Sequence, residues 1–93
     1  MAKLRYTPKF AKDLTEIAEY IEKDSQILSK EFVHKVLQRP QLLETNSLVG
    51  RIVPEKANPN LREIFFLGNY RMVYRLKNEI IEVLMIRHAA RLR

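Results

Sequence analysis

The sequence predicts an α+β fold in which an antiparallel helix hairpin packs on one face of a curved, mainly antiparallel sheet. Within residues 8–45, apolar side chains recur at helical spacing. From Val49 onward, β-branched and aromatic residues dominate, which is typical of strands. Two short turn sequences, at residues 68–69 and 77–78, divide this second half into an antiparallel meander. The expected order of elements is therefore β-α-α-β-β-β-β.

The N-terminal half is expected to open with a short strand over residues 2–7. Thr7 is typical of a helix N-cap and Pro8 of a first helical position, which predicts a helix over about residues 8–23. Four apolar residues, spaced by four, three and four positions, form the inner stripe of this helix: Phe10, Leu14, Ile17 and Ile21.

A second helix is expected over about residues 26–45, and Asp24 and Ser25 can end the first helix and cap the second. Its inner stripe consists of Phe32, Val33, Val36, Leu37 and Leu43. Proline has no backbone N–H and its ring clashes with the preceding turn, so Pro40 predicts a kink or break near residues 36–40. His34 on this helix is expected to be an exposed side chain without a function.

Four strands are expected in the second half, over residues 50–55, 61–67, 70–76 and 79–87, with a loop at 56–60. Side chains of a strand alternate between the two faces of the sheet. In the strand 70–76, Tyr70, Met72, Tyr74 and Leu76 are therefore assigned to the core. Arg71, Val73 and Arg75 are assigned to the opposite face, where arginine side chains can gather.

Length and composition limit the classes of protein to consider. A chain of 93 residues predicts a single domain, with residues 1–46 as strand and hairpin and residues 47–93 as an arginine-rich sheet and tail. The absence of cysteine excludes disulfides and thiolate metal sites, and two histidines suggest no metal site, so no cofactor is expected. No apolar run approaches the roughly 20 residues of a membrane span. The N-terminus does not resemble a signal peptide, which predicts a cytoplasmic protein.

Positive charge is concentrated in the second half of the chain. The whole chain has 17 basic and 11 acidic residues, with a net charge of +6. Residues 47–93 carry nine basic and four acidic side chains, and seven of the nine are arginines. The guanidinium group matches phosphate and carboxylate oxygens, so this balance favours nucleic acid or an acidic protein as partner. The alternative is a solvated basic surface that only keeps the protein soluble.

Five segments, taken in order, resemble RelE/ParE toxins of type II toxin–antitoxin systems. They are the first-helix segment 10–17 and the segments 50–55, 61–64, 70–75 and 86–91. The resemblance implies a plasmid-stabilisation type of toxin that inhibits growth and binds a cognate acidic antitoxin in a hetero-oligomer. It implies one of two activities: RelE-like cleavage of mRNA on the ribosome by a metal-independent endoribonuclease, or ParE-like, non-catalytic inhibition of DNA gyrase. An RNA- or DNA-binding module without toxicity is a third alternative.

The resemblance to nuclease members also implies a set of site residues. RNA cleavage without a metal needs a base, a cation that binds the phosphate, and an acid. These roles match Glu55 as base, Arg71 as phosphate ligand and His88 as acid. Further phosphate ligands would be Arg51, Arg62, Arg87 and Arg91.

Each catalytic role has a structural alternative. Glu55 can cap a turn, Arg71 can pair with Glu63 or Glu82, and His88 can be structural. Glu63 itself is expected to be the cross-strand partner of an arginine. If the nuclease assignment holds, replacing Arg71 by alanine should abolish toxicity and leave the melting temperature nearly unchanged.

Overall fold

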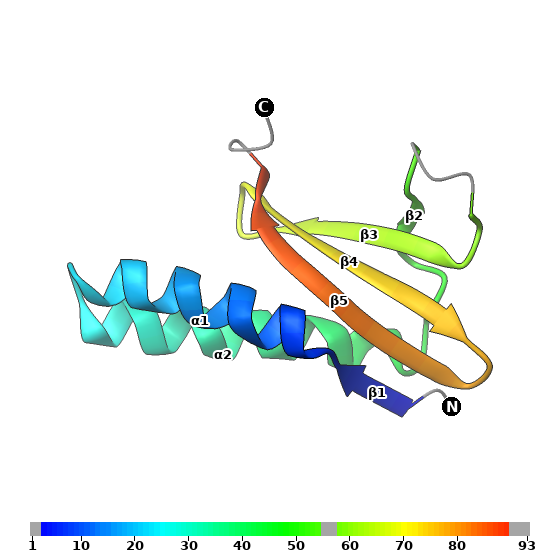
Figure 1. Cartoon of the computed structure of the whole chain (residues 1–93), viewed down its shortest axis with the longest axis horizontal. Helices are drawn as coiled ribbons and strands as arrows, with labels where there is room; N and C mark the ends of the chain where they lie inside the picture. The colour runs from blue at the N-terminus through cyan, green and yellow to red at the C-terminus, as the bar shows by residue number, and fades with distance from the viewer. Residues whose placement is uncertain (1–2, 55–57, 90–93) are drawn as a thin grey trace.

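Two helices cover one side of a five-stranded sheet in the protein's structure, a computed structural model that describes residues 3–54 and 58–89 (Figure 1). The predicted order β-α-α-β-β-β-β is confirmed. The bounds of the elements are β1 Lys3–Tyr6, α1 Pro8–Glu22, α2 Gln26–Leu43, β2 Arg51–Ile52, β3 Leu61–Phe66, β4 Tyr70–Lys77 and β5 Ile80–His88.

The strands lie in the order β1-β5-β4-β3-β2. Strands β2 to β5 pair antiparallel, whereas β1 pairs parallel to β5, with Lys3 opposite Ile80 and Tyr6 opposite Val83. This pairing joins the two ends of the chain, and it makes the sheet mainly but not wholly antiparallel. The sequence pattern identified the first strand but did not reveal its neighbour.

A β-bulge interrupts the pairing of β4 with β5. Val73 lies opposite Met85, but the next residue, Tyr74, lies opposite Val83. Leu84 is therefore one extra residue in β5, and it shifts the alternation of every later residue of that strand by one position.

The turns and one strand differ from their expected bounds. The β2 strand has two residues rather than six. The β3–β4 connection has three residues, 67–69, in which Leu67 and Gly68 adopt φ angles of 49° and 85°. The β4–β5 turn lies at residues 78–79 because Lys77 still pairs with Ile80, and Asn78 takes the left-handed conformation with φ of 56°.

Both helices begin at the predicted caps. The Thr7 hydroxyl accepts a hydrogen bond from the Phe10 backbone N–H, and the Ser25 hydroxyl accepts one from the Leu28 N–H. In the described chain, neither helix is both long and apolar enough to cross a membrane.

The predicted break at Pro40 is wrong. The α2 helix runs without interruption from Gln26 to Leu43, and Pro40 lies fully buried inside its last turns. Proline removes one hydrogen bond of the helix, so packing of the buried ring must offset this loss. Tertiary packing thus overrides the local preference.

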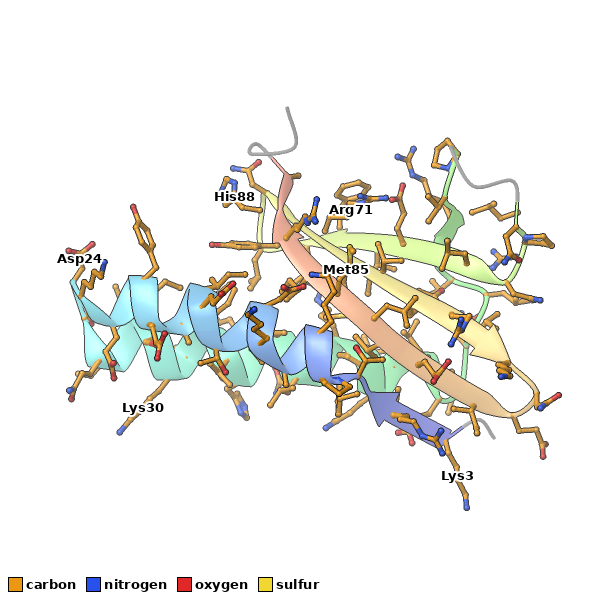
Figure 2. The ribbon with its side chains drawn as sticks, in the orientation of Figure 1. Lys3, Asp24, Lys30, Arg71, Met85 and His88 are labelled. Carbon is orange, nitrogen blue, oxygen red and sulfur yellow. The ribbon has the colours of Figure 1, made fainter. Side chains whose placement is uncertain are left out.

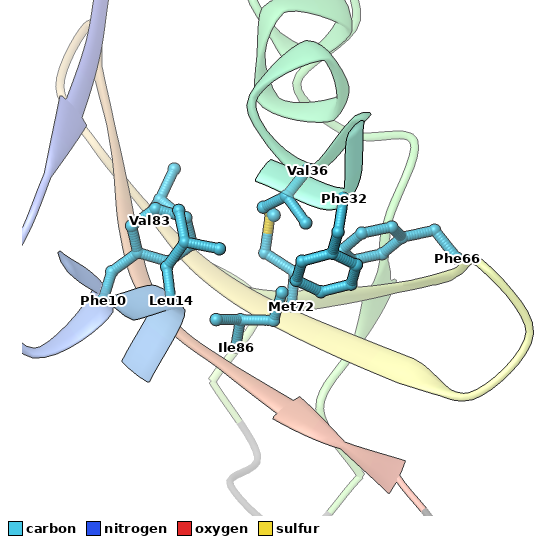
Figure 3. Packing of buried hydrophobic residues seen from close by; sticks show 8 residues of the cluster. All are labelled: Phe10, Leu14, Phe32, Val36, Phe66, Met72, Val83 and Ile86. Atoms are coloured by element: carbon cyan, nitrogen blue, oxygen red, sulfur yellow. The ribbon is translucent and has the colours of Figure 1, made fainter. Parts of the chain in front are cut away.

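The core fills the space between the hairpin and the sheet (Figure 3). Its main cluster joins two residues of α1, two of α2 and four of the sheet: Phe10, Leu14, Phe32, Val36, Phe66, Met72, Val83 and Ile86. Ile17, Ile21, Val33 and Leu37 pack against this cluster as partly buried side chains. Both predicted helical stripes are confirmed, and so is the burial of Met72 and Tyr74.

Tyr74 attaches the segment before β2 to the centre of the sheet. Its hydroxyl accepts a hydrogen bond from the Gly50 N–H at 2.9 Å and donates one to the Ser47 carbonyl at 2.9 Å. A Cβ atom at residue 50 would lie 2.5 Å from this hydroxyl, so only glycine fits there. Burial raises the pKa of Tyr74, although the Gly50 N–H and the charge of Arg62 partly oppose the rise.

We expect Tyr74→Phe to lower the free energy of unfolding by about 1–3 kcal/mol near neutral pH, because the buried Gly50 N–H loses its acceptor. A pKa raised by folding stabilises the protein below the unfolded value of about 10, and this contribution is lost as the pH rises through the folded value. The difference between wild type and Tyr74→Phe should therefore narrow above about pH 10. Urea denaturation at neutral and alkaline pH measures both effects.

The control is Tyr20→Phe, at a side chain that is 59% exposed. Equal stability of wild type and Tyr74→Phe at neutral pH would show that the hydroxyl does not hold this segment.

Candidate functional site

The candidate site lies on the face of the sheet that points away from the helices, called the outer face below. Ile64 and Phe66 of β3 pack on the core, so Glu63 and Phe65 must point to the outer face. Arg71 lies directly opposite Phe65 and points the same way. Figure 2 shows Arg71 on the side of the sheet remote from both helices. The face predicted for Arg71 is confirmed.

A buried carboxylate joins two arginines on this face. The side chain of Glu63 is only 1% exposed. One of its carboxylate oxygens accepts a hydrogen bond from Arg71 Nε at 2.5 Å, and the other accepts one from Arg51 Nε. The strand register causes this arrangement, since Arg51 lies directly opposite Glu63 and Arg71 lies diagonal to it. The expected cross-strand pairing of Glu63 is confirmed, with two arginines rather than one.

Two more side chains complete what we call the outer-face cluster, which consists of Arg51, Glu63, Phe65, Arg71 and Arg87. The Arg51 guanidinium lies 5.4 Å above the centre of the Phe65 ring, and this ring is 50% exposed. Arg87 is exposed and lies directly opposite Arg71 in the β4–β5 pair. Among the described residues, the cluster thus combines three guanidinium groups with one carboxylate, and guanidinium groups are suited to bind anions.

A second ion pair lies farther along the outer face. The Arg75 guanidinium donates to Glu82 from Nε at 2.9 Å and also from Nη2. This hydrogen bonding is the main reason that the pKa of Glu82 lies below its ordinary value. The Glu82 side chain is 15% exposed, against 1% for Glu63, so this pair is closer to solvent.

Arg62 does not join the outer-face cluster, contrary to the sequence expectation. It lies opposite Tyr74 and Ile52 and therefore points to the helix side of the sheet. Its guanidinium donates to the Pro59 carbonyl at 3.1 Å and to the Gly50 carbonyl at 3.0 Å. These bonds to the backbone give Arg62 a structural role in holding the segments on either side of β2.

His88 also lies on the helix side. It is opposite Tyr70 in the sheet, and the two rings meet edge to face with centroids 4.9 Å apart. Tyr70 in turn packs against Phe32 of α2, which fixes this face as the helix side. Within the described residues, the buried His88 Nδ1 atom has no hydrogen-bond partner. His88 and Arg71 thus point to opposite faces of the sheet.

The bulge in β5 explains this separation. Because Leu84 is an extra residue, Ile86 and His88 point to the helix side, and Arg87 points to the outer face. Unbroken alternation from the buried Val83 would have given the reverse assignment. Of the remaining predicted site residues, Glu55 and Arg91 lie outside the described residues.

A pocket of about 640 Å³ lies between α1 and the end of β5. Its polar lining comes mainly from Lys9, Asp13, Glu16, Arg87 and His88. Asp13 is held in place by the Lys9 ammonium group at 2.9 Å and by the Ile86 backbone N–H at 3.3 Å. Residues 3–54 and 58–89 contain no group of three or more His, Asp or Glu side chains that is arranged to hold a metal ion.

Sequence reasoning missed Phe65 as a member of the cluster. Its position two residues after Glu63 on the same strand was the available signal, because residues two apart share a face. The burial of Glu63 had no such signal, since a charged residue in a strand is normally exposed.

Comparison with known proteins identifies one matching family. Residues 4–93 match the family model described as ParE toxin of type II toxin–antitoxin system, parDE. No curated protein sequence matches the chain. The structure is similar to that of the chromosomal ParDE system from P. aeruginosa, with a TM-score of 0.78 and 22% identity over 95% of this chain and 96% of that chain.

Two E. coli structures share the fold at lower similarity. YafQ from strain BL21(DE3) has a TM-score of 0.67 and 17% identity, over 99% of this chain and 98% of that chain. A chain of the DinJ–YafQ complex has a TM-score of 0.57 and 13% identity, again over 99% and 98%.

We expect Arg71→Ala to lower the free energy of unfolding by about 1–3 kcal/mol, because a buried carboxylate loses one of its two cations. The structure thus predicts a loss of stability where the sequence alone predicted a nearly unchanged melting temperature. The matched control, Arg75→Ala, should cost no more than about 1 kcal/mol, since Arg75 is 43% exposed. Urea denaturation of the three proteins provides the comparison. Equal losses in the two variants would contradict a special role of the Glu63 carboxylate.

Proposed function

Because the chain belongs to the ParE toxin family of type II toxin–antitoxin systems, we propose that it arrests growth by binding and inhibiting DNA gyrase. In this proposal the toxin acts through its surface and catalyses no reaction on nucleic acid. RelE-like cleavage of mRNA is the second candidate.

The separation of Arg71 and His88 carries the proposal. In metal-free RNA cleavage, the phosphate-binding cation and the acid must both reach one phosphodiester group. Arg71 lies on the outer face, whereas His88 lies on the helix side against Tyr70. Side chains on opposite faces of the sheet are poorly placed to act together on one phosphodiester. An inhibitor that acts by binding has no such requirement.

The second candidate is favoured by one observation, the outer-face cluster itself. Its arginines form a surface of the kind that binds phosphate groups. In this alternative, Glu55 would act as base and His88 as acid, after a rearrangement that brings His88 to the outer face. Arg91 would be a further phosphate ligand.

The end of the helix hairpin is our proposed contact surface for gyrase. Three large apolar side chains are exposed near the α1–α2 connection: Tyr20 (59%), Ile27 (73%) and Leu28 (57%). Exposed apolar residues that lie close together commonly mark a protein-binding surface. The adjacent charges of α1 and α2 would form its polar rim.

A cognate antitoxin is the second proposed partner. The chain's net charge of +6 favours an acidic antitoxin segment. One structural neighbour is a complex of YafQ with DinJ, which supports a comparable toxin–antitoxin hetero-oligomer here.

The proposal predicts that Ile27→Glu raises the concentration needed to inhibit gyrase by about tenfold or more, as expected for a central interface residue. His88→Ala should leave inhibition unchanged. Purified gyrase and relaxed plasmid provide the supercoiling assay, and induced expression in cells provides DNA damage and ribosomal mRNA cleavage as parallel readouts. The matched control is Leu42→Glu, at a residue that is 62% exposed near the other end of α2.

Cleaved mRNA together with normal supercoiling would refute gyrase inhibition and support the second candidate. Loss of mRNA cleavage on His88→Ala would then assign the histidine its catalytic role.

A further inference from the structure

We infer that Thr7 is a positioning residue whose hydroxyl group holds the bulge in β5 and so keeps His88 and Arg71 on opposite faces of the sheet. Thr7 is the N-cap of α1 and lies far along the chain from both residues. The inference rests on the proposed function and deepens it, because the separation of these two side chains carries that proposal. It concerns the conformation of β5 and involves no ligand and no reaction.

Thr7 contacts the bulge through its side chain and its backbone. The hydroxyl oxygen lies 3.1 Å from the Val83 carbonyl oxygen and 3.1 Å from the Leu84 carbonyl oxygen, so one O–H group donates to both. The Thr7 backbone N–H also donates to the Val83 carbonyl, at 3.2 Å. The start of α1 therefore meets β5 at the two residues where the pairing with β4 shifts.

The double contact of the hydroxyl requires a bulged backbone. In a regular strand, the carbonyl groups of successive residues point toward opposite neighbouring strands. A hydroxyl group at one edge of the strand would then reach only one of two successive carbonyls. The bulge disrupts this alternation, and both Val83 and Leu84 present their carbonyls to Thr7. Without the bulge, Thr7 would lose one of these acceptors.

Helix capping alone does not account for these contacts. A cap needs only an acceptor, and the Thr7 hydroxyl oxygen accepts from the Phe10 N–H at 3.2 Å. Ser25 shows this acceptor role at the start of α2, where its hydroxyl accepts from the Leu28 N–H. The Thr7 hydroxyl uses its proton as well, for the carbonyls of β5. It therefore caps α1 as an acceptor and holds the bulge as a donor.

The side chains of β5 also suit a register without the bulge, so residue types alone do not select the observed one. Removing the bulge would turn every later residue of the strand to the other face. Met85 would replace Ile86 in the core, and the two apolar side chains have similar volumes. Arg87 would turn toward α1, into the pocket that Asp13 and Glu16 line. A contact specific to the bulge is therefore needed to hold the observed register.

The register of β5 decides the surroundings of His88. In the observed register its ring lies edge-on to the Tyr70 ring, with centroids 4.9 Å apart. Without the bulge, the imidazole would leave Tyr70 and turn to the outer face, where Arg71 lies. Tyr70 and Arg71 are neighbours in β4, so the two registers give His88 different and distinguishable contacts. The contact with Tyr70 thus reports on the register.

Substitutions at position 7 separate the donor role from the acceptor role. At neutral pH, Thr7→Asp keeps an oxygen that caps α1 but has no O–H group to donate, whereas Thr7→Ser keeps both. In Thr7→Asp, the nuclear Overhauser effects between the ring protons of His88 and Tyr70 should be lost. The backbone amides of Ile86 and Arg87 should exchange with solvent about fivefold faster or more, as expected for one lost hydrogen bond. Thr7→Ser should keep the wild-type values of both measurements.

The matched control is Ser25→Ala, which removes the capping hydroxyl of α2. Loss of a cap lowers stability in this variant too, so a general loosening of the fold would disturb His88 here as well. The contact between His88 and Tyr70 should persist in Ser25→Ala. Circular dichroism establishes that each variant is folded.

Two further changes cover the case in which Thr7→Asp does not fold. Thr7→Val keeps the branched shape of threonine without the hydroxyl, and it should also lose the contact between His88 and Tyr70. Deletion of Leu84 removes the bulge and leaves the faces of the later residues unchanged. In the chain without Leu84, Thr7→Val should leave this contact intact, because there is no bulge to hold.

Several results would overturn the inference. One is a contact between His88 and Tyr70 that persists in folded Thr7→Asp or Thr7→Val. Another is loss of this contact in Thr7→Ser or in Ser25→Ala. A third is an effect of Thr7→Val on this contact or on folding that is as large without Leu84 as with it. These measurements contain no gyrase, so they can fail or succeed independently of the supercoiling assay that tests the proposed function.

Discussion

The outer face depends on one buried carboxylate between two guanidinium groups. Glu63 places a negative charge against Arg71, which lies directly opposite the like charge of Arg87 in the sheet. The same carboxylate fixes Arg51, which belongs to a strand of only two residues. On the helix side, Arg62 and Tyr74 hold the segment before that strand through its backbone. The short β2 edge is thus held from both faces of the sheet.

Most of the fold could be predicted because it follows from local rules. Thr7 and Ser25 cap the helices, and the apolar stripes identify the faces that pack on the sheet. The features that could not be predicted depend on distant contacts. The parallel pairing of β1 with β5 joins the two ends of the chain, and Pro40 remains helical because tertiary packing outweighs its local cost.

The candidate site was predictable in part, and the limits have identifiable causes. Alternation correctly placed Arg71 on the outer face. The same rule, applied to β3, places Arg62 with Ile64 and Phe66 on the helix side, so the sequence already contained the signal against grouping it with the other arginines. The sheet faces of Arg87 and His88 could not be derived from the alternation of residues in the sequence, because residue types do not reliably reveal a β-bulge.

The bulge at Leu84 means that backbone geometry, and not residue order alone, decides which side chains of β5 share a face of the sheet. A strand of the same sequence without the bulge would place Ile86 and His88 on the outer face and Arg87 on the helix side. The imidazole would then share a face of the sheet with Arg71, whereas deletion of Leu84 itself would leave these faces unchanged. One irregular backbone position can therefore regroup side chains on this scaffold without any substitution among them.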